Sequence, residues 1–560
     1  MSYRAPLDAF RQAMAVIGSQ RLAETARFSE ATPETVEAVL GEAGRLAADV
    51  LAPLQRPGDL HPARLENGVV RSSPGYADGY AAIVDGGWVG ICADAAHGGM
   101  GLPQTLGSAV GEMFASSCLS LSLCPLLSQG QIDALENHAP DWIRALWLPK
   151  LVSGEWTGTM NLTEPQAGSD VGALTSRAEP VGDGSYKISG QKIYISWGDH
   201  DMAGNVLHLV LARLPDAPPG TRGVSLFIVP KRIDFDDGPA RPNSLRVVSL
   251  EHKLGLHGSP TCVMEFDGAV GWLVGPENGG MACMFTMMNN ARLGVGVQGV
   301  GIAEAACQKA LAFALERKQG RTPTGNGRGP IADHADVRRM LMQMQVLTTV
   351  SRMLCLDCAF SLDMARAAPA ADRDAWAARG AALTPIAKSF GTDAGCAVAD
   401  LGIQIHGGMG FVEETGAAQL LRDVRVTTIY EGTNGIQALD LVGRKLADGG
   451  AAVFALIEEM RAAAISDAAL NALDDATRWM LDAAPQDRAA GASAYLEAFA
   501  LVLGARYLER AAALAPEDGR ASALAAFHRA RNLPQAIALC AEAKAGSQTL
   551  YAVEPEALAS

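Results

Sequence analysis

The spacing of hydrophobic residues divides the chain into helical and strand-forming regions. Over residues 31–155 the apolar positions recur every three to four residues, which predicts amphipathic helices. The first begins at Thr32-Pro33, because a threonine N-cap followed by proline satisfies the free amides and presets φ. Residues 1–30 carry the same spacing. We therefore expect a helical leader over 1–30 and an N-terminal helical domain over 31–155.

At about residue 156 the period of the pattern falls to two, as expected of half-buried strands. Asp183-Gly184 lies between two alternating runs in TSRAEPVGDGSYKISGQKIYIS, which is a strong β-hairpin signal. The segments VLHLVLARL, GVSLFIVPK and TCVMEFDGA predict further strands. We expect a middle β domain over residues 156–275.

Helical spacing returns after the β domain in three long segments joined by short links, which favours a four-helix-type bundle over residues 276–447. After Asp448-Gly449-Gly450 an alanine-rich segment is again patterned for helices and carries no functional motif that we recognise. It predicts an appended helical domain over 448–560. The fold class is thus mostly α with an inserted β domain.

Composition narrows the possible functions. The net charge of −15 argues against a nucleic-acid or anionic-membrane partner, because neutralising phosphate requires a basic face. No run of 18 apolar residues appears, and the opening MSYRAPLDAF is unlike a signal peptide, so we expect a cytoplasmic protein. Ten scattered cysteines favour reduced thiols. Cys355 and Cys358 form a CxxC in a helical pattern without further ligands, so we expect a structural role and no metal site.

The segment around Glu431 is the strongest candidate for chemistry. This acid lies between an apolar, aromatic run that ends at Tyr430 and the small residues Gly432, Thr433 and Asn434. Reduced hydration there would raise its pKa and suit it to proton abstraction. An acid at this place can instead simply favour the positive end of the next helix. The residues alone leave both interpretations open.

Two glycine-containing motifs need separate treatment. Gly294, Gly296 and Gly299 match GxGxxG, but no strand precedes them, which argues against a dinucleotide-binding fold and favours close helix packing. In NLTEPQAGSDVG, Thr163 can donate hydrogen bonds at a strand exit, and the turn at Ser169 presents amides to an anion. An ordinary Asx or Ser turn explains that motif equally well.

Seven segments in the same order resemble the acyl-CoA dehydrogenase family and lie within roughly residues 80–446. They are GGWVGICADAAHGGMGLP, MNLTEPQAGSDVG, GQKIYISWGDHD, ARLGVGVQGVG with ALERKQGR, and IHGGMGF with IYEGTNGIQ. The opening, the long C-terminal tail and IYEGTNGIQALDLVGRKL are similar to the larger subgroup that includes 3-methylmercaptopropionyl-CoA dehydrogenase. The resemblance implies a helical N-terminal domain, a middle β domain and a C-terminal bundle.

The resemblance also implies a reaction and a set of site residues. FAD-dependent α,β-dehydrogenation would convert an acyl-CoA to the trans-2-enoyl-CoA, with Glu431 as the base and an electron-transfer flavoprotein as the electron acceptor. The thioester oxygen would be held by the Glu431 amide and a ribityl hydroxyl. The implied cofactor-binding residues are Leu162, Thr163, Tyr194, Ser196, Arg317, Gln404, Gly407, Gly408 and Thr433. The implied substrate-binding residues are Ser169, Asn289, Arg292, Tyr430 and Gly432.

Several positions depart from the family pattern. Tyr194 and Ser196 stand where the family usually has Trp and Thr, and Trp197 fills a position expected to be small, so that it either narrows the cavity or packs outward. Asn289 replaces an acid found in some relatives. Some members place the base at the position of Ala291, which leaves Glu431 as the candidate here.

The resemblance implies that four residues reach the cofactor of a neighbouring subunit: Arg317, Gln404, Gly407 and Gly408. It therefore implies a homo-oligomer, for which we expect a dimer, with a tetramer as the alternative. Alternatives from other classes are an acyl-CoA oxidase, which admits oxygen to the same site, and a purely structural helical protein, which would purify colourless. A non-catalytic, nucleic-acid-binding stress relative would need a basic C-terminal face, and residues 451–560 carry no marked cationic excess. Acyl length and use of a methylthio substrate are left open by the sequence.

Overall fold

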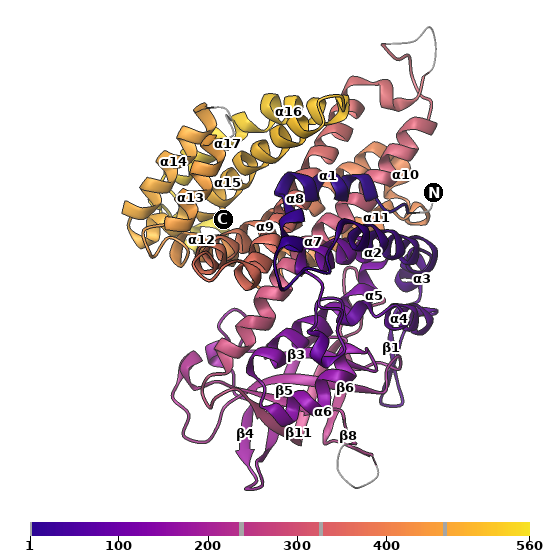
Figure 1. Cartoon of the computed structure of the whole chain (residues 1–560), viewed down its shortest axis with the longest axis vertical. Coiled ribbons are helices and arrows are strands. Elements are labelled where there is room, and N and C mark those ends of the chain that lie inside the picture. Colours follow the sequence, from indigo (N-terminus) through magenta and orange to yellow (C-terminus); the bar gives the residue numbers. More distant parts are fainter. Residues whose placement is uncertain (1–2, 235–239, 324–328, 463–466, 560) are drawn as a thin grey trace.

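The computed structural model describes residues 3–234, 240–323, 329–462 and 467–559. Figure 1 shows a β-sheet region at one end, with helices stacked against it and a yellow C-terminal group of helices beside the central ones. The N-terminal helices lie on the other side of the central helices. This arrangement places the sheet, the N-terminal helices and the central bundle next to one another.

The N-terminal region is helical, as the pattern predicts, except for one short hairpin. Thr32 accepts a hydrogen bond from the Thr35 amide, and Pro33 is the first residue of α2. The hairpin turns at Asn67 and Gly68, both with positive φ. Asn-Gly is a typical two-residue hairpin turn, so the purely helical expectation for 31–155 is wrong here. The elements are α1 Leu7–Ile17, α2 Pro33–Leu46, α3 Gln55–Leu60, β1 Arg64–Glu66, β2 Val69–Arg71, α4 Tyr76–Asp85, α5 Gln104–His138 and α6 Asp141–Val152.

Helix α5 bends at Cys118, whose φ of −152° and ψ of 83° interrupt the helix. By length and composition α5 passes as a membrane span, but 83% of its most apolar window is buried inside the protein. That burial is what a core helix of a globular fold shows. Among the described residues, α5 is the one helix that meets this criterion.

The middle region forms a seven-stranded sheet in the order β3-β6-β7-β11-β5-β4, with β10 also paired to β11. β4 and β5 pair in antiparallel fashion across Asp183-Gly184, which confirms the predicted hairpin. β3 and β6 are parallel, and β6, β7 and β11 correspond to the three further predicted strands. The strands are β3 Trp156–Asn161, β4 Arg177–Pro180, β5 Ser185–Ser196, β6 Asn205–Ala212, β7 Ser225–Pro230, β8 Arg232–Ile233, β9 Arg241–Pro242, β10 Leu245–Leu250 and β11 Thr261–Val274.

Three long helices, α7, α8 and α9, form the central bundle. The glycines of the GxGxxG match lie inside α7, where a Cβ on Gly299 would be 2.3 Å from the Gly391 carbonyl oxygen of α9. This confirms close helix packing as their role. The elements are α7 Gly280–Glu316, α8 Ala335–Ala367, α9 Arg373–His406, α10 Gly408–Phe411, α11 Ala417–Val424 and α12 Asn434–Gly443.

The C-terminal helices pack directly on the bundle, and their buried side chains belong to the same hydrophobic core. Tyr507 of α15 donates a hydrogen bond of 2.6 Å to buried Asp357 of α8. Arg379 of α9 donates to Glu459 of α13 at 3.1 Å. These helices are therefore joined to the bundle by both apolar and polar contacts. They are α13 Ala451–Ala462, α14 Asp467–Asp482, α15 Pro485–Leu514, α16 Gly519–Arg531 and α17 Leu533–Ala543.

Candidate active site

Glu431 lies in the short connection between η10, residues Arg425–Thr428, and α12. Its φ is +56°, and Gly432 follows at +81°. A left-handed conformation is uncommon for a non-glycine residue and persists only where the surroundings enforce it. Thr433 caps α12 by accepting a hydrogen bond from the Ile436 amide. Glu431 therefore precedes the cap and is not a first-turn acid of α12.

The surroundings of Glu431 set its protonation. The side chain is half-buried. Burial raises the pKa of Glu431 to about 7, and the positive charges of Arg292 and Lys388 oppose that rise. A carboxyl group with a pKa near 7 exists in both protonation states at neutral pH, as a general base requires.

The two cations are held by different elements. Arg292 of α7 is 5% exposed and pairs with Asp440 of α12 at 3.6 Å. Its Nη1 also donates to Asn289, at 3.4 Å. Buried Lys388 of α9 donates from Nζ to Asn434, at 2.8 Å. α7, α9 and α12 thus meet around the Glu431 connection.

Three buried polar atoms in this region lack a partner within the described part of the chain: Arg292 Nε, Gln298 Nε2 and Gln437 Oε1. Such atoms are rare in native proteins and call for an explanation such as a bound group. The Tyr430 hydroxyl donates to Gln298 Oε1, and the amide of Gln437 donates to the Glu431 carbonyl at 3.2 Å. The unpaired atoms therefore surround the segment that carries Glu431.

A cavity of about 80 Å³ lies between α5 and α7 and includes Gln298 in its lining. Trp88 and Phe114 form part of its wall and meet edge to face, with ring centroids 6.0 Å apart. Asp133 and Arg366, paired at 2.9 Å, also line it. Because Gln298 contacts Tyr430, one end of this cavity adjoins the Glu431 segment.

The other side of the site is formed by the end of β5. Tyr194 has a φ of +60°, sits where the register between β5 and β11 shifts, and is 61% exposed. The amide of Ile193 donates to the Thr163 carbonyl at 2.9 Å, which brings the two predicted segments together. Ser196 is half-buried on the same strand. The end of β5 thus carries the exposed Tyr194 ring and the Ser196 hydroxyl, and Thr163 is joined to the same strand.

A buried ion pair fixes the segment that contains Leu162 and Thr163. Lys192 of β5 is fully buried and donates to the Leu162 carbonyl at 3.0 Å and to Glu164 at 2.8 Å. Glu164 also accepts hydrogen bonds from Thr175 and Ser176. Burial alone would raise the pKa of Glu164, but Lys192 and these donors lower it to about 2. Ser169 is exposed and lies in the turn between Glu164 and Thr175.

Trp197 packs inward and away from the exposed ring of Tyr194. It is fully buried, with a φ of +53°. Its indole N–H donates to the Ser120 carbonyl at 3.2 Å, beside the bend of α5, and its ring stacks on Tyr76. The Trp197 ring therefore does not pack outward.

Arg317 and the Gln404–Gly408 segment lie at the opposite end of α7 and α9. All four predicted residues there are exposed, and His406 stacks on Phe313 at 4.5 Å, which joins the ends of the two helices. Arg317 is 25 residues beyond Arg292, or about 37 Å along the axis at ~1.5 Å per residue. The structure therefore does not bring this set together with Glu431 within one chain. Exposed apolar side chains on these ends are Leu311, Leu315, Met409 and Phe411.

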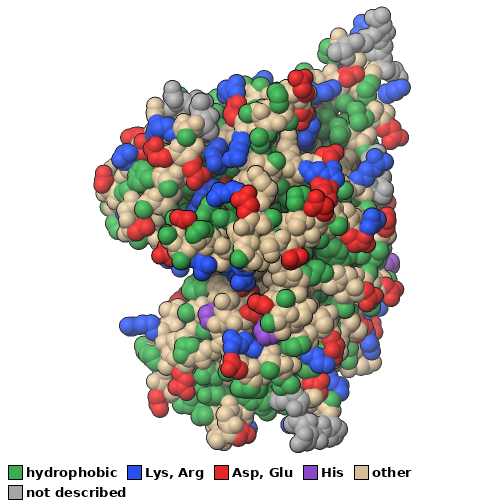
Figure 2. Space-filling view, viewed as in Figure 1, with side chains coloured by type: hydrophobic (Ala, Val, Ile, Leu, Met, Phe, Trp, Pro, Cys, Tyr) green, Lys and Arg blue, Asp and Glu red, His purple; other side chains and the backbone are tan. Residues whose placement is uncertain are grey.

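Sequence reasoning missed Lys388, Gln298, Gln437 and Asp440. Lys388 and Gln298 are single polar residues inside otherwise apolar or small-residue helical segments, a pattern that can signal a buried polar role. Gln437 and Asp440 are polar residues on the buried face of α12. In the space-filling view of Figure 2, the surface is hollowed between the helical part and the β domain. Lys, Arg and His side chains lie along this hollow.

Comparison with known proteins places these features in context. Family models match residues 21–155 (acyl-CoA dehydrogenase, N-terminal domain), 159–269 (middle domain) and 278–446 (C-terminal domain). The chain is 49% identical over 455 residues to 3-methylmercaptopropionyl-CoA dehydrogenase of Ruegeria pomeroyi, which covers 80% of this chain and 77% of that protein.

Two solved structures share the fold at low sequence identity. Caenorhabditis elegans ACDH-11 in complex with C11-CoA superposes with a TM-score of 0.78 at 21% identity, covering 97% of this chain and 91% of that one. A Bacillus anthracis acyl-CoA dehydrogenase complexed with FAD superposes with a TM-score of 0.73 at 20% identity, covering 95% and 90%.

Proposed function

The chain belongs to the acyl-CoA dehydrogenase family of oxidoreductases, and on that premise we propose that it oxidises a short acyl-CoA with FAD as cofactor and Glu431 as base. The observation that carries the proposal is the half-buried Glu431 carboxyl, with a pKa of about 7, in a segment whose Tyr430 contacts Gln298 in the cavity wall. The resemblance allows a base at one other position, 291, but the residue there is alanine, which cannot accept a proton. Glu431 would accept the α-proton of the thioester.

The residues at the β5 edge suit a flavin ring. Tyr194 offers an exposed aromatic face, and the hydroxyls of Thr163 and Ser196 can donate to polar ring atoms. FAD, when bound, supplies the acceptor for the β-hydride. The FAD complex of the Bacillus anthracis relative supports this cofactor.

The Glu431 backbone has a second role in this proposal. Its amide N–H donates to no acceptor within residues 3–234, 240–323, 329–462 and 467–559. A free amide beside the base can donate to the thioester oxygen as negative charge develops there. Such a donor typically contributes about 3–4 kcal/mol to a reaction of this kind.

We propose a short acyl group as substrate, with 3-methylthiopropionyl-CoA as the first candidate. The cavity of about 80 Å³ holds several times the ~10–15 Å³ that one water needs, which suits a tail of a few heavy atoms. Trp88 and Phe114 in its wall offer aromatic contacts to a thioether sulfur, worth about 0.3–1.5 kcal/mol each. The substrate named for the Ruegeria pomeroyi relative agrees with this choice.

Three further elements complete the proposal. An electron-transfer flavoprotein would reoxidise the reduced cofactor. A second copy of the chain would cover Leu315, Met409 and Phe411, which is 87% exposed, and would bring Arg317 to its partner's cofactor. A cytoplasmic location is supported by ten free cysteines, which persist in reducing compartments.

The test is anaerobic reduction of bound flavin by a panel of acyl-CoAs, including butyryl-, octanoyl- and 3-methylthiopropionyl-CoA. Loss of the Glu431 base should slow flavin bleaching in Glu431→Gln by at least about a hundredfold, within the range for a general base, at unchanged FAD content. Equal bleaching rates in the two proteins would exclude Glu431 as base. Peroxide formation in air without added flavoprotein would identify an oxidase instead.

A further inference from the structure

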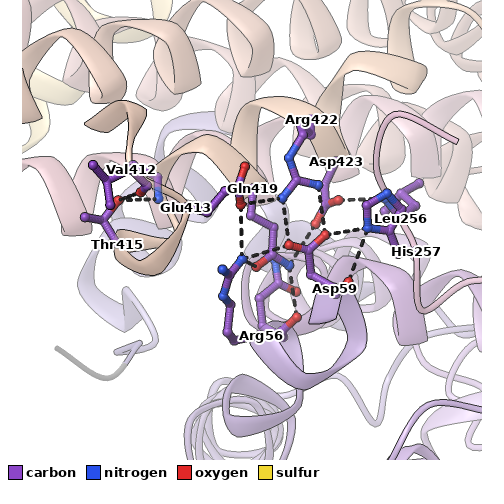
Figure 3. Close-up of polar contacts among 12 residues, drawn as sticks. Arg56, Asp59, Leu256, His257, Val412, Glu413, Thr415, Gln419, Arg422 and Asp423 are labelled. Atoms are coloured by element: carbon purple, nitrogen blue, oxygen red, sulfur yellow. Dashed lines mark hydrogen bonds and ion pairs between the residues drawn. The ribbon is translucent and has the colours of Figure 1, made fainter. Parts of the chain in front are cut away.

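Three regions of the chain meet at one buried carboxylate, Asp59, at the end of α3. Arg422 of α11 donates to it from both Nη atoms, at 2.8 and 2.6 Å, and Arg56 donates at 2.8 Å. His257, from the segment between β10 and β11, faces it at 2.8 Å. The Asp59 side chain is 5% exposed. Figure 3 shows these groups converging from the three regions. Asp59, His257, Arg422 and Asp423 are called the Asp59 junction below.

The Asp59 carboxylate is surrounded by cationic and hydrogen-bonding groups. Burial alone would raise the pKa of Asp59, but Arg422, His257 and Arg56 hold it below its ordinary value. The second ring nitrogen of His257 faces the Lys253 carbonyl at 3.0 Å. His257 thus links Asp59 to the backbone of the 251–260 loop through its two ring nitrogens. A buried bidentate pair with its remaining acceptor sites filled holds one fixed orientation.

A second contact ties the same loop to α11. The Leu256 amide donates to Asp423 at 2.6 Å, and Leu256 has a φ of +52°. A Cβ on Gly255 would lie 2.4 Å from the Arg422 carbonyl oxygen, so the loop backbone rests directly on the α11 backbone. These contacts therefore fix the position of the loop relative to α11.

Both sides of the junction lead to the candidate active site. On the sheet side, the Pro260 carbonyl accepts a hydrogen bond from the Trp197 amide at 2.8 Å, directly after Ser196. On the bundle side, α11 ends at Val424, and η10 connects it to Glu431. Seven non-glycine residues of the described chain have positive φ, and four lie on this path. Those four are Tyr194, Trp197, Leu256 and Glu431.

We propose that the Asp59 junction fixes the separation between the Tyr194–Ser196 edge and Glu431. Asp59, Arg422 and His257 are then positioning residues, which act through α11 and the 251–260 loop and touch neither substrate nor cofactor. The inference rests on the proposed function, because it assigns the two sides of the site to cofactor and base. Its physical basis is that an ångström-scale displacement of a reacting group can cost about a hundredfold in rate.

Hydrogen exchange tests the junction without any substrate. Asp59→Asn should exchange faster than the unchanged protein over residues 251–260 and 417–433. Asp357→Asn is the matched control, because Asp357 is also a buried acceptor of a bidentate arginine, Arg379, and lies away from this path. Unchanged exchange in both segments, or equal acceleration in the control, would overturn the proposal.

Kinetics supply the functional readout. In Asp59→Asn the rate of flavin reduction at saturating acyl-CoA should fall about tenfold to a hundredfold, while the Kd for acyl-CoA changes less than about threefold. Arg422→Lys, which keeps the charge and loses the bidentate pair, should show the same effect and replaces Asp59→Asn if that variant fails to fold. A wild-type rate in a folded variant would contradict the proposal. Failure of every acyl-CoA to reduce the unchanged protein would reject the proposed function, while exchange still decides the junction.

Discussion

Two arginines, one within helix α7 and one directly after its last residue, lie in opposite settings. Arg292 is buried, paired with Asp440 and close to Glu431, so its charged partners come from the same chain. Arg317 follows the last turn of α7 and is exposed, beside apolar side chains that are exposed as well. A buried cation tunes a neighbouring acid, whereas an exposed one is available to a ligand or another molecule. In the proposed function, the Arg292 region takes part in the chemistry and the Arg317 region is completed by a second copy.

Of the two arginines, Arg292 should have the larger effect on the chemistry. Its charge lowers the pKa of Glu431, so Arg292→Leu should shift the pH midpoint of flavin reduction above 7 and slow reduction at pH 7 by about tenfold to a hundredfold, since each unit is a factor of ten. Stopped-flow reduction over pH 6–9 measures both. Arg292→Lys keeps the charge, so its pH midpoint should lie close to that of the wild type. An unshifted midpoint in Arg292→Leu would refute the electrostatic role of Arg292.

Removing Arg317 should affect the cofactor and spare the chemistry. A charged hydrogen bond is worth about 1.5–3 kcal/mol, so Arg317→Ala should weaken FAD binding by about tenfold to a hundredfold at an unchanged reduction rate per bound flavin. Fluorescence titration of the apoprotein measures the affinity. Lys318→Ala, the next exposed cation, serves as control, and equal FAD affinity in both variants would remove Arg317 from the cofactor site.

The unchanged enzyme should itself depend on pH through Glu431. The base must be ionised, so flavin reduction should rise with pH through about 7 and be roughly tenfold slower one unit below that midpoint than on the plateau. The folded state binds this proton more tightly than the unfolded chain, so the contribution of Glu431 to stability falls as pH rises from about 4.5 to about 7. Glu431→Gln should therefore melt at a higher temperature, relative to wild type, at pH 8 than at pH 5.

The smallest effect is expected at the cap of α12. Thr433→Ala removes the hydrogen bond to the Ile436 amide and should cost about 1 kcal/mol of stability. Thermal melting monitors the loss, and flavin reduction should slow by less than about tenfold. Thr428→Ala, at a half-buried threonine of the neighbouring η10, is the matched control. A melting temperature equal to that of the control would show that the cap contributes nothing.

The parts of the fold that follow from residue spacing could be predicted from the sequence. Period-two runs gave β5, β6, β7 and β11, and Thr32-Pro33 marked the start of α2. Trp197 could not be oriented, because its direction depends on its left-handed backbone and on the bend of α5 at Cys118. Neither feature has a local sequence signal.

The candidate site divides in the same way. An acid between an aromatic run and a glycine turn makes Glu431 a candidate, but its residues alone also allow a role at the start of the next helix, and the family resemblance favours the base. Lys388 and Gln298 set the charge and polarity beside Glu431. Each is an isolated polar residue in a largely apolar or small-residue stretch of a long helix. Only the packing of α7 and α9 against the Glu431 connection reveals their contacts. The junction at Asp59 was missed for the same reason, since its members are spread over 364 residues from Asp59 to Asp423.

The shared core of α15 and the bundle has a consequence for how the protein denatures. Gly504 of α15 lies against Val350 of α8, and Tyr507 supplies a partner for buried Asp357. Deleting the final hundred residues would thus expose an apolar surface and remove the Tyr507 donor from Asp357, which Arg379 alone would then pair. Instead of shedding an independent module on heating, the chain should lose its last helices and its bundle together, in one cooperative transition.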